Sequence, residues 1–210
     1  TSGKENVFMG TDAGGAVTTT TRLVYIGFEA GAANANGIGN TAVGWKALRQ
    51  YDLEHTNTAI GAEAMSGAGA SNSCVAIGNE TLAGSTTTGA NGTVGIGYQA
   101  LKALTSGGGN IAVGFEAGLL VTDNTDNVMI GHQAFNASDS GDSENVVIGS
   151  NAGGAVNHGS SDGNVLIGLS AGLGGAAALA DCVVIGKNAM KSTAGNAQSG
   201  TVAIGKDALT

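Results

Sequence analysis

The sequence predicts an all-β fold: a parallel β-solenoid (a β-roll or β-helix) of about 12 coils with 17–19 residues per coil. Two observations support this prediction. A glycine-centred unit such as Asn145-Val146-Val147-Ile148-Gly149 recurs twelve times, and a short β-branched segment precedes every copy of the glycine. The twelve glycines, which we expect to form structural corners, are Gly10, Gly27, Gly44, Gly61, Gly78, Gly97, Gly114, Gly131, Gly149, Gly168, Gly186 and Gly205.

The residues before each glycine predict a strand. We number each repeat from its glycine, which is position 0. Position −1 is apolar in all twelve copies and position −3 is β-branched in all of them, whereas position −2 varies from Gly95 to Tyr25. Alternation with a period of two residues indicates a strand whose −3 and −1 side chains share one face. We expect that face to form the core, so Ile148→Asp should destabilise the fold strongly.

The glycine itself indicates a sharp corner. It is replaced in none of the twelve copies, although Ala or Ser would appear if only a small residue were needed. Strict glycine predicts either a positive φ or a backbone packed where no Cβ fits. Position +3 is Ala except at Thr81, and position +4 is either Gly or a larger apolar residue, so a second segment returns to the core. A polar loop of variable sequence then leads to the next copy.

Asparagine at position −4 predicts a ladder of side chains along the stack. Coils stacked in register place equivalent amides above one another, where they can form hydrogen bonds between coils. Cys74 and Cys182 occupy this position six coils apart, which is roughly 29 Å at ~4.8 Å per strand. We therefore expect no disulfide between them. The seven asparagines are Asn6, Asn40, Asn57, Asn110, Asn127, Asn145 and Asn164.

Composition limits the class of protein. The 210 residues are 42% apolar and only 4% aromatic, which fits one repeat domain, residues 1–210, with a thin core. The net charge is −8 and basic residues are not clustered, so we expect no binding to nucleic acid. The longest apolar runs are shorter than the ~18 residues of a membrane helix, so we expect no membrane insertion.

Apparent catalytic motifs belong to the repeat. Gly168-Leu169-Ser170-Ala171-Gly172 matches a hydrolase nucleophile elbow, yet Ser170 occupies a variable position of the repeat and no helix pattern follows it. Glu63 and Glu80 are stacked at position +2 and are the nearest approach to a paired-carboxylate site. The histidines fall in different repeat phases. We expect no catalysis and no cofactor.

Two features suggest ligands. The acidic loops 123–126 and 139–144 carry oxygen ligands suited to Ca²⁺, although solvated, flexible polar loops are the favoured interpretation. Phe28 and Trp45 occupy position +1 in adjacent copies and form a candidate ligand patch for a sugar or a protein. The alternative is that these rings cover the corner or fill a subunit interface.

The unit Asn40-Thr41-Ala42-Val43-Gly44-Trp45-Lys46-Ala47-Leu48 resembles the head repeat of trimeric autotransporter (YadA-like) adhesins and the repeat arrays of bacteriophage tail-fibre proteins. The resemblance covers almost the whole chain. It implies a parallel β-roll, commonly trimeric, in an extracellular, cell-surface or virion fibre.

We therefore expect a non-enzymatic structural or adhesive fibre segment. Its expected partners are copies of itself, with a surface glycan or protein receptor as a further candidate. The alternative is a subunit of an extracellular filament that stacks head to tail, because the first and last repeats keep the core pattern without a polar cap.

Overall fold

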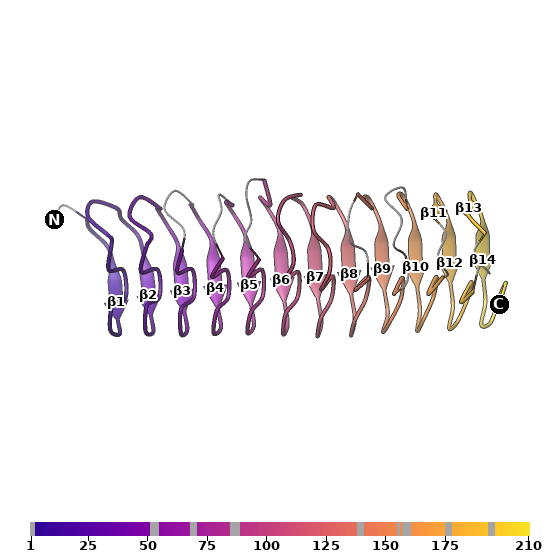
Figure 1. The fold of residues 1–210 in the computed structure, drawn as a ribbon, viewed down its shortest axis with the longest axis horizontal. Helices are drawn as coiled ribbons and strands as arrows, with labels where there is room; N and C mark the ends of the chain where they lie inside the picture. Colours follow the sequence, from indigo (N-terminus) through magenta and orange to yellow (C-terminus); the bar gives the residue numbers. More distant parts are fainter. Residues whose placement is uncertain are drawn as a thin grey trace.

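The predicted parallel β-solenoid is confirmed by a computed structural model, which describes residues 3–50, 55–67, 71–84, 89–137, 141–154, 156, 161–174, 178–192 and 196–210. One strand from each repeat joins a single twelve-stranded parallel sheet in chain order, so the coils form one row (Figure 1). The described residues contain no helix. The strands are β1 (Val7–Met9), β2 (Val24–Ile26), β3 (Thr41–Val43), β4 (Thr58–Ile60), β5 (Val75–Ile77), β6 (Val94–Ile96), β7 (Ile111–Val113), β8 (Val128–Ile130), β9 (Val146–Ile148), β10 (Val165–Ile167), β12 (Val183–Ile185) and β14 (Val202–Ile204).

Two further strands form a short second ladder in the last coils. β11 (Leu179–Ala180) pairs in parallel with β13 (Gln198–Ser199) on the loop side of the solenoid (Figure 1). In the main sheet every residue pairs with its equivalent in the next coil, as Ile130 does with Ile148. Each repeat position therefore becomes a column of side chains running along the axis of the solenoid.

The orientation predicted for the strands is wrong: position −2 faces the core, and positions −3 and −1 face outward. Val147 and Leu166 at position −2 are fully buried, whereas Ile148 is only half-buried and Ile130 is exposed. The expectation that Ile148→Asp would disrupt the core is wrong for the same reason. The uniform β-branched columns belong to the outer surface of the sheet, and the variable column belongs to the interior.

Variation at position −2 is explained by the residue at position +4. Both side chains enter the same slot in the core, and most coils combine one large residue with one small one. Leu166 is followed by Gly172, where an added Cβ would lie 2.7 Å from Leu166 Cδ2. Ala42, in contrast, is followed by Leu48, and both are fully buried. In most coils the core is thus filled by whichever of the two positions carries the larger side chain. The coil of Ala112 and Gly118 has two small residues, and there Leu101 and Met129 of the neighbouring coils occupy the space beside Gly118.

Exchanging these two residues within one coil tests this account. Leu166→Ala should destabilise the fold by about 2–5 kcal/mol because it leaves a cavity. Gly172→Leu should also destabilise it, because the new side chain overlaps Leu166. The double variant, which copies the Ala42 and Leu48 pair, should recover much of the loss in a thermal-unfolding double-mutant cycle. Additive losses would contradict a shared slot.

The corner glycines meet both physical requirements predicted for them. Their φ angles run from 126° at Gly205 to 145° at Gly114, a region that L side chains rarely adopt. At Gly149 an added Cβ would also lie 2.4 Å from the carbonyl oxygen of Gly168 in the next coil. Gly205 differs, because a Cβ added there has no neighbour within 4 Å. Eleven of the corners are thus closed to any side chain by the adjacent coil as well as by their backbone angle.

Positive φ angles continue beyond the glycine. Position +2 has φ between 53° and 57° in every coil, and position +4 lies in the same left-handed region even where it is Leu48 or Phe135. This backbone aims amides at both neighbouring coils: Lys46 N donates to Phe28 O at 2.8 Å, and Leu48 N donates to Ala64 O at 2.9 Å. These bonds offset the conformational cost of about 1–2 kcal/mol for each non-glycine residue.

Substitution of Gly149 by alanine should lower the melting temperature clearly, because the new Cβ meets the next coil and the backbone is strained by about 1–3 kcal/mol. Ser150→Ala, one residue away on the surface, should change stability by less than about 0.5 kcal/mol. Gly205→Ala carries the same backbone strain without the steric contact, so its effect should be intermediate. Equal melting temperatures for all three would show that the corners are neither strained nor closed.

The asparagine ladder is confirmed. Each side-chain oxygen accepts a hydrogen bond from the backbone N–H of position −4 in the next coil, as Asn127 Oδ1 does from Asn145 N at 2.9 Å. In six of the seven asparagines the side-chain nitrogen donates into the loop side of the next coil, as Asn145 Nδ2 does to Ser161 O at 2.8 Å. Cys182 ends one run of the ladder, and both cysteines are free and buried, as expected from their separation. Burial raises the pKa of the Cys74 thiol.

Candidate functional site

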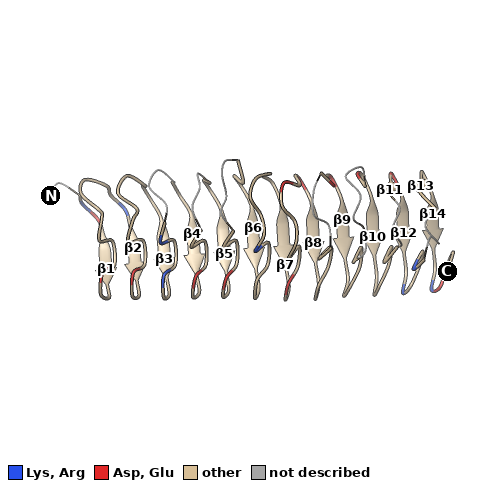
Figure 2. Ribbon diagram, viewed as in Figure 1, with Lys and Arg blue, Asp and Glu red and all other residues tan. Residues whose placement is uncertain are grey.

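The outward face of the sheet is an apolar surface that runs along all twelve strands. It consists of the −3 and −1 side chains of the twelve strands, which we call the outer strip. Apart from Thr41 and Thr58, every residue of the strip is Val, Ile or Met. The strands carry no charged residue, and charges gather instead at the corners and loops (Figure 2). Several side chains remain more than a third exposed, among them Ile60, Ile111 and Ile130.

A second surface is formed by positions +1 and +2 at the corners, which we call the corner columns. Phe28 and Trp45, the candidate patch from the sequence, lie here with 42% and 46% of their surface exposed. Lys46 Nζ lies 4.2 Å from the centre of the Trp45 ring. The two aromatic rings are exposed in adjacent coils, but the ring stacks found among the described residues lie elsewhere.

The sequence analysis missed a longer stack of rings in the same column. Tyr98, Phe115 and His132 occupy position +1 of three successive coils. Their ring centres are 5.1 and 5.2 Å apart and their planes differ by 18° and 7°. Tyr98 and Phe115 are 41% and 44% exposed. Three successive rings at one repeat position were the signal in the sequence that these side chains lie in one column.

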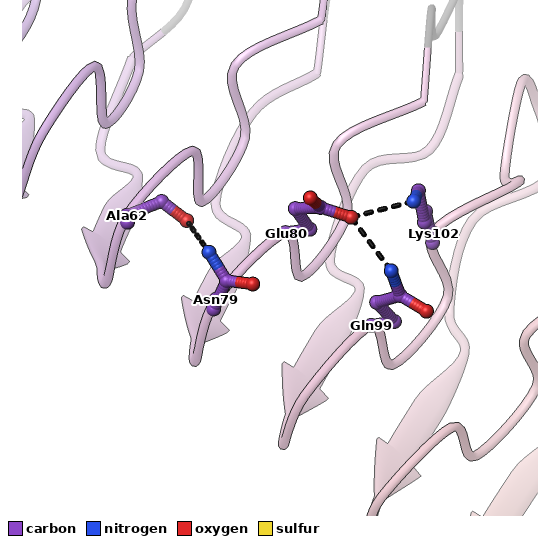
Figure 3. Close-up of polar contacts among 5 residues, drawn as sticks. All are labelled: Ala62, Asn79, Glu80, Gln99 and Lys102. Atoms are coloured by element: carbon purple, nitrogen blue, oxygen red, sulfur yellow. Dashed lines mark hydrogen bonds and ion pairs between the residues drawn. The ribbon is translucent and has the colours of Figure 1, made fainter.

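Polar side chains of the corner columns form contacts between neighbouring coils (Figure 3). Glu80 Oε2 accepts hydrogen bonds from Gln99 Nε2 at 2.7 Å and from Lys102 Nζ at 2.5 Å. Asn79 Nδ2 donates to Ala62 O at 3.1 Å, so its amide is directed toward the preceding coil. The hydrogen bonds from Lys102 and Gln99 lower the pKa of Glu80. Glu80 is thus held by Gln99 and Lys102 of the following coil, and no hydrogen bond is found between it and Glu63 among the described residues.

Elsewhere in the +2 column, side chains also link neighbouring coils. Gln133 Nε2 donates to Glu116 Oε2 at 2.7 Å, and Asn188 Nδ2 donates to Asp207 Oδ1 at 2.9 Å. The hydrogen bond from Asn188 lowers the pKa of Asp207. Pairing an amide with a carboxylate of a neighbouring coil avoids, at these pairs, the repulsion that two stacked carboxylates would produce.

The acidic loops use their carboxylates to hold the loop of the next coil. Asp123 Oδ1 accepts a hydrogen bond from Gly141 N, and Asp142 Oδ1 accepts one from Ser161 N, both at 2.9 Å. The described residues contain no group of three or more potential metal ligands among His, Cys, Asp and Glu. Asp139 and Ser140 of the second loop lie outside the described residues. The Ca²⁺ expectation stays untested.

The remaining candidates from the sequence, Ser170 and the histidines, lie in separate coils. Ser170 adopts a left-handed φ of 54°, and its N–H donates to Ser150 O in the preceding coil. His55 Nδ1 accepts a hydrogen bond from Ile38 N at 3.0 Å, whereas His158 lies outside the described residues. These side chains are therefore not gathered into one site.

A surface depression of about 410 Å³ lies beside the first coils. Arg49 Nε lies 2.8 Å from Glu29 Oε2 there. This ion pair neutralises Glu29, one of the two acidic residues that line the depression. This ion pair crosses between adjacent coils, as the corner pairs do, so it contributes to coil stacking. The depression is lined by Asp12, Gly15, Glu29, Ala32, Ala33, Arg49 and Gln50.

Comparisons with protein-family models, with curated proteins and with solved structures gave no match for this chain. Across the described residues, no helix has the length and apolar character needed to cross a bilayer. Function must therefore be argued from the outer strip and the corner columns.

Proposed function

We propose that this chain is a non-enzymatic structural segment of an extracellular, cell-surface or virion fibre, in which copies of the chain pack side by side through the outer strip. The observation that carries the proposal is the strip itself, which is apolar except at Thr41 and Thr58 and is free of charge over twelve strands. Folded proteins rarely leave a continuous apolar surface of this extent in water. Burial of the strip would add apolar contacts along the whole length of the solenoid.

A second copy of the chain is the occupant that fits the strip best. The strip repeats once per coil, at the ~4.8 Å spacing of adjacent parallel strands. Another copy aligned in parallel has the same spacing, so every rung meets an equivalent rung. Closed cyclic symmetry then buries the same surface on each copy. The resemblance to trimeric adhesin heads and tail fibres favours three copies around one axis.

The polar groups support a structural role rather than a catalytic one. The carboxylates of Glu80 and Glu116 receive hydrogen bonds from amides of the following coil, and Glu29 pairs with Arg49. The buried asparagines are bonded along the stack. Groups of this kind hold the coils in register, which is the property that a stiff fibre requires.

Charges placed on the strip should dissociate the assembly while the coils stay folded. In the double variant Ile130→Asp/Ile148→Asp, two carboxylates would be buried against a second copy without partners. We expect the parent to sediment with the mass of a trimer and the variant with the mass of one chain. Ser150→Asp, which adds charge at the corner instead, should leave the mass unchanged. Sedimentation equilibrium gives the mass, and circular dichroism confirms that β structure is retained.

A parent protein that stays monomeric at high concentration would contradict packing through the strip. Electron micrographs showing particles of one width and unlimited length would instead support the head-to-tail filament, because end-to-end contacts do not close. In that case the two strip substitutions would leave filament length unchanged.

A further inference from the structure

We propose that the corner columns bind a second copy of the chain that runs in the opposite direction, so that two solenoids, or two fibres built from them, associate side by side through their corners. This contact goes beyond the proposed function, in which copies pack in parallel through the outer strip. The two contacts use different side chains, so the corner contact can succeed or fail independently of the strip.

The corner columns carry large apolar side chains along one edge of the solenoid. The corners lie in a row because the coils are stacked in register (Figure 1). Exposed apolar side chains in one row form a surface that a partner can bury. Five residues at position +1 are between 41% and 46% exposed: Phe28, Trp45, Tyr98, Phe115 and Leu169.

Charges in the same columns are segregated along the axis (Figure 2). The last two coils carry the exposed lysines Lys187 and Lys206 at position +1, with Asp207 beside them. The first seven coils carry one lysine in these columns, Lys46, against five carboxylates. An edge that is acidic in its first coils and basic in its last coils is complementary to a copy of itself that runs in the opposite direction. The five carboxylates are those of Asp12, Glu29, Glu63, Glu80 and Glu116.

A twofold axis between the sixth and seventh coils defines the register of the contact. It places the first coil of one copy opposite the twelfth coil of the other, the second opposite the eleventh, and so on inward. Glu29 then faces Lys187. Asp12 faces Lys206 and Asp207, whose Nζ and Oδ2 atoms lie 3.5 Å apart and form a neutral corner.

The same register brings the apolar side chains together. Trp45 in the third coil faces Leu169 in the tenth, and Tyr98 in the sixth coil faces Phe115 in the seventh. Each pair occurs twice, because the contact has twofold symmetry. Surface ion pairs contribute little affinity by themselves, so the apolar pairs supply the binding and the charges set its direction.

Other alignments bring like charges together. In a parallel contact, every carboxylate of the columns would meet its own equivalent. In an antiparallel contact shifted by one coil, Glu80 would face Glu116 for a shift one way, and Lys46 would face Lys187 for a shift the other way. Like charges placed directly opposite each other are destabilising. The order of charges along the corners therefore selects one direction and one register.

Sedimentation equilibrium of the full chain should show twice the mass at about 0.01 M salt, where the Debye length is about 30 Å, as at about 1 M salt, where it is about 3 Å. The masses expected for the outer strip are then read at high salt. Lys187→Glu places a carboxylate opposite Glu29 and should abolish the doubling. Lys4→Glu makes the same change of charge at an exposed residue outside the corner columns and should preserve it. Trp45→Ala should weaken the association roughly tenfold.

Cysteine cross-linking tests the direction and the register. Ala62 and Ser150 occupy position +1 of the fourth and ninth coils, which face each other in the proposed contact. Under oxidation at low salt, a mixture of the Ala62→Cys and Ser150→Cys variants should form a cross-linked dimer, and neither variant alone should do so. The native cysteines are buried and do not interfere. The proposal is overturned if the mass is the same at both salt concentrations, if Lys187→Glu doubles as the parent does, or if the mixture forms no cross-link that the single variants lack.

Discussion

The structure depends on one constraint: every coil must present the same backbone to the coils on either side. The glycine corner is where the constraint is strictest, because the carbonyl of the next glycine occupies the space of a Cβ at Gly149 and at its equivalents. The left-handed residues at positions +2 and +4 follow from the same requirement, since their amides reach the coils before and after. Strain that would be costly in one isolated turn is offset here by hydrogen bonds repeated in every coil.

Features imposed by this stacking were predictable from the sequence, because they appear as strict columns. The repeat length, the glycine corner and the asparagine ladder are all of this kind. Which face of each strand is buried was not predictable from the β-branched pattern alone, because a strand of three residues shows only one alternation. The better signal was the compensation between positions −2 and +4, as in Leu166 with Gly172 and Ala42 with Leu48. When two residues share a core slot, one is small where the other is large. Residues on the surface have no such size constraint.

The corner columns were predictable as exposed but not as a site. Phe28 and Trp45 were recognised because they are large rings in adjacent repeats, yet the ring stacks lie further along the chain. Whether two neighbouring rings stack depends on side-chain torsions, which repeat position does not determine. The hydrogen bonds that link Glu80 to Gln99 and Lys102 were equally hidden, because they also depend on side-chain torsions.

The three columns therefore differ in uniformity for physical reasons. An interior position needs only to fill space together with its core neighbours, so it can change from Ala112 to Met129 between adjacent coils. A corner position faces solvent, so its side chains can change in charge and size from coil to coil.

The outer strip faces solvent in one chain but keeps β-branched or apolar residues on every rung, although water imposes no such requirement. The strip would stay apolar on every rung if an external surface with the same ~4.8 Å period contacted each of them. A second copy of this solenoid has that period over its whole length, which is why the outer strip, rather than any polar cluster, supports the proposed assembly.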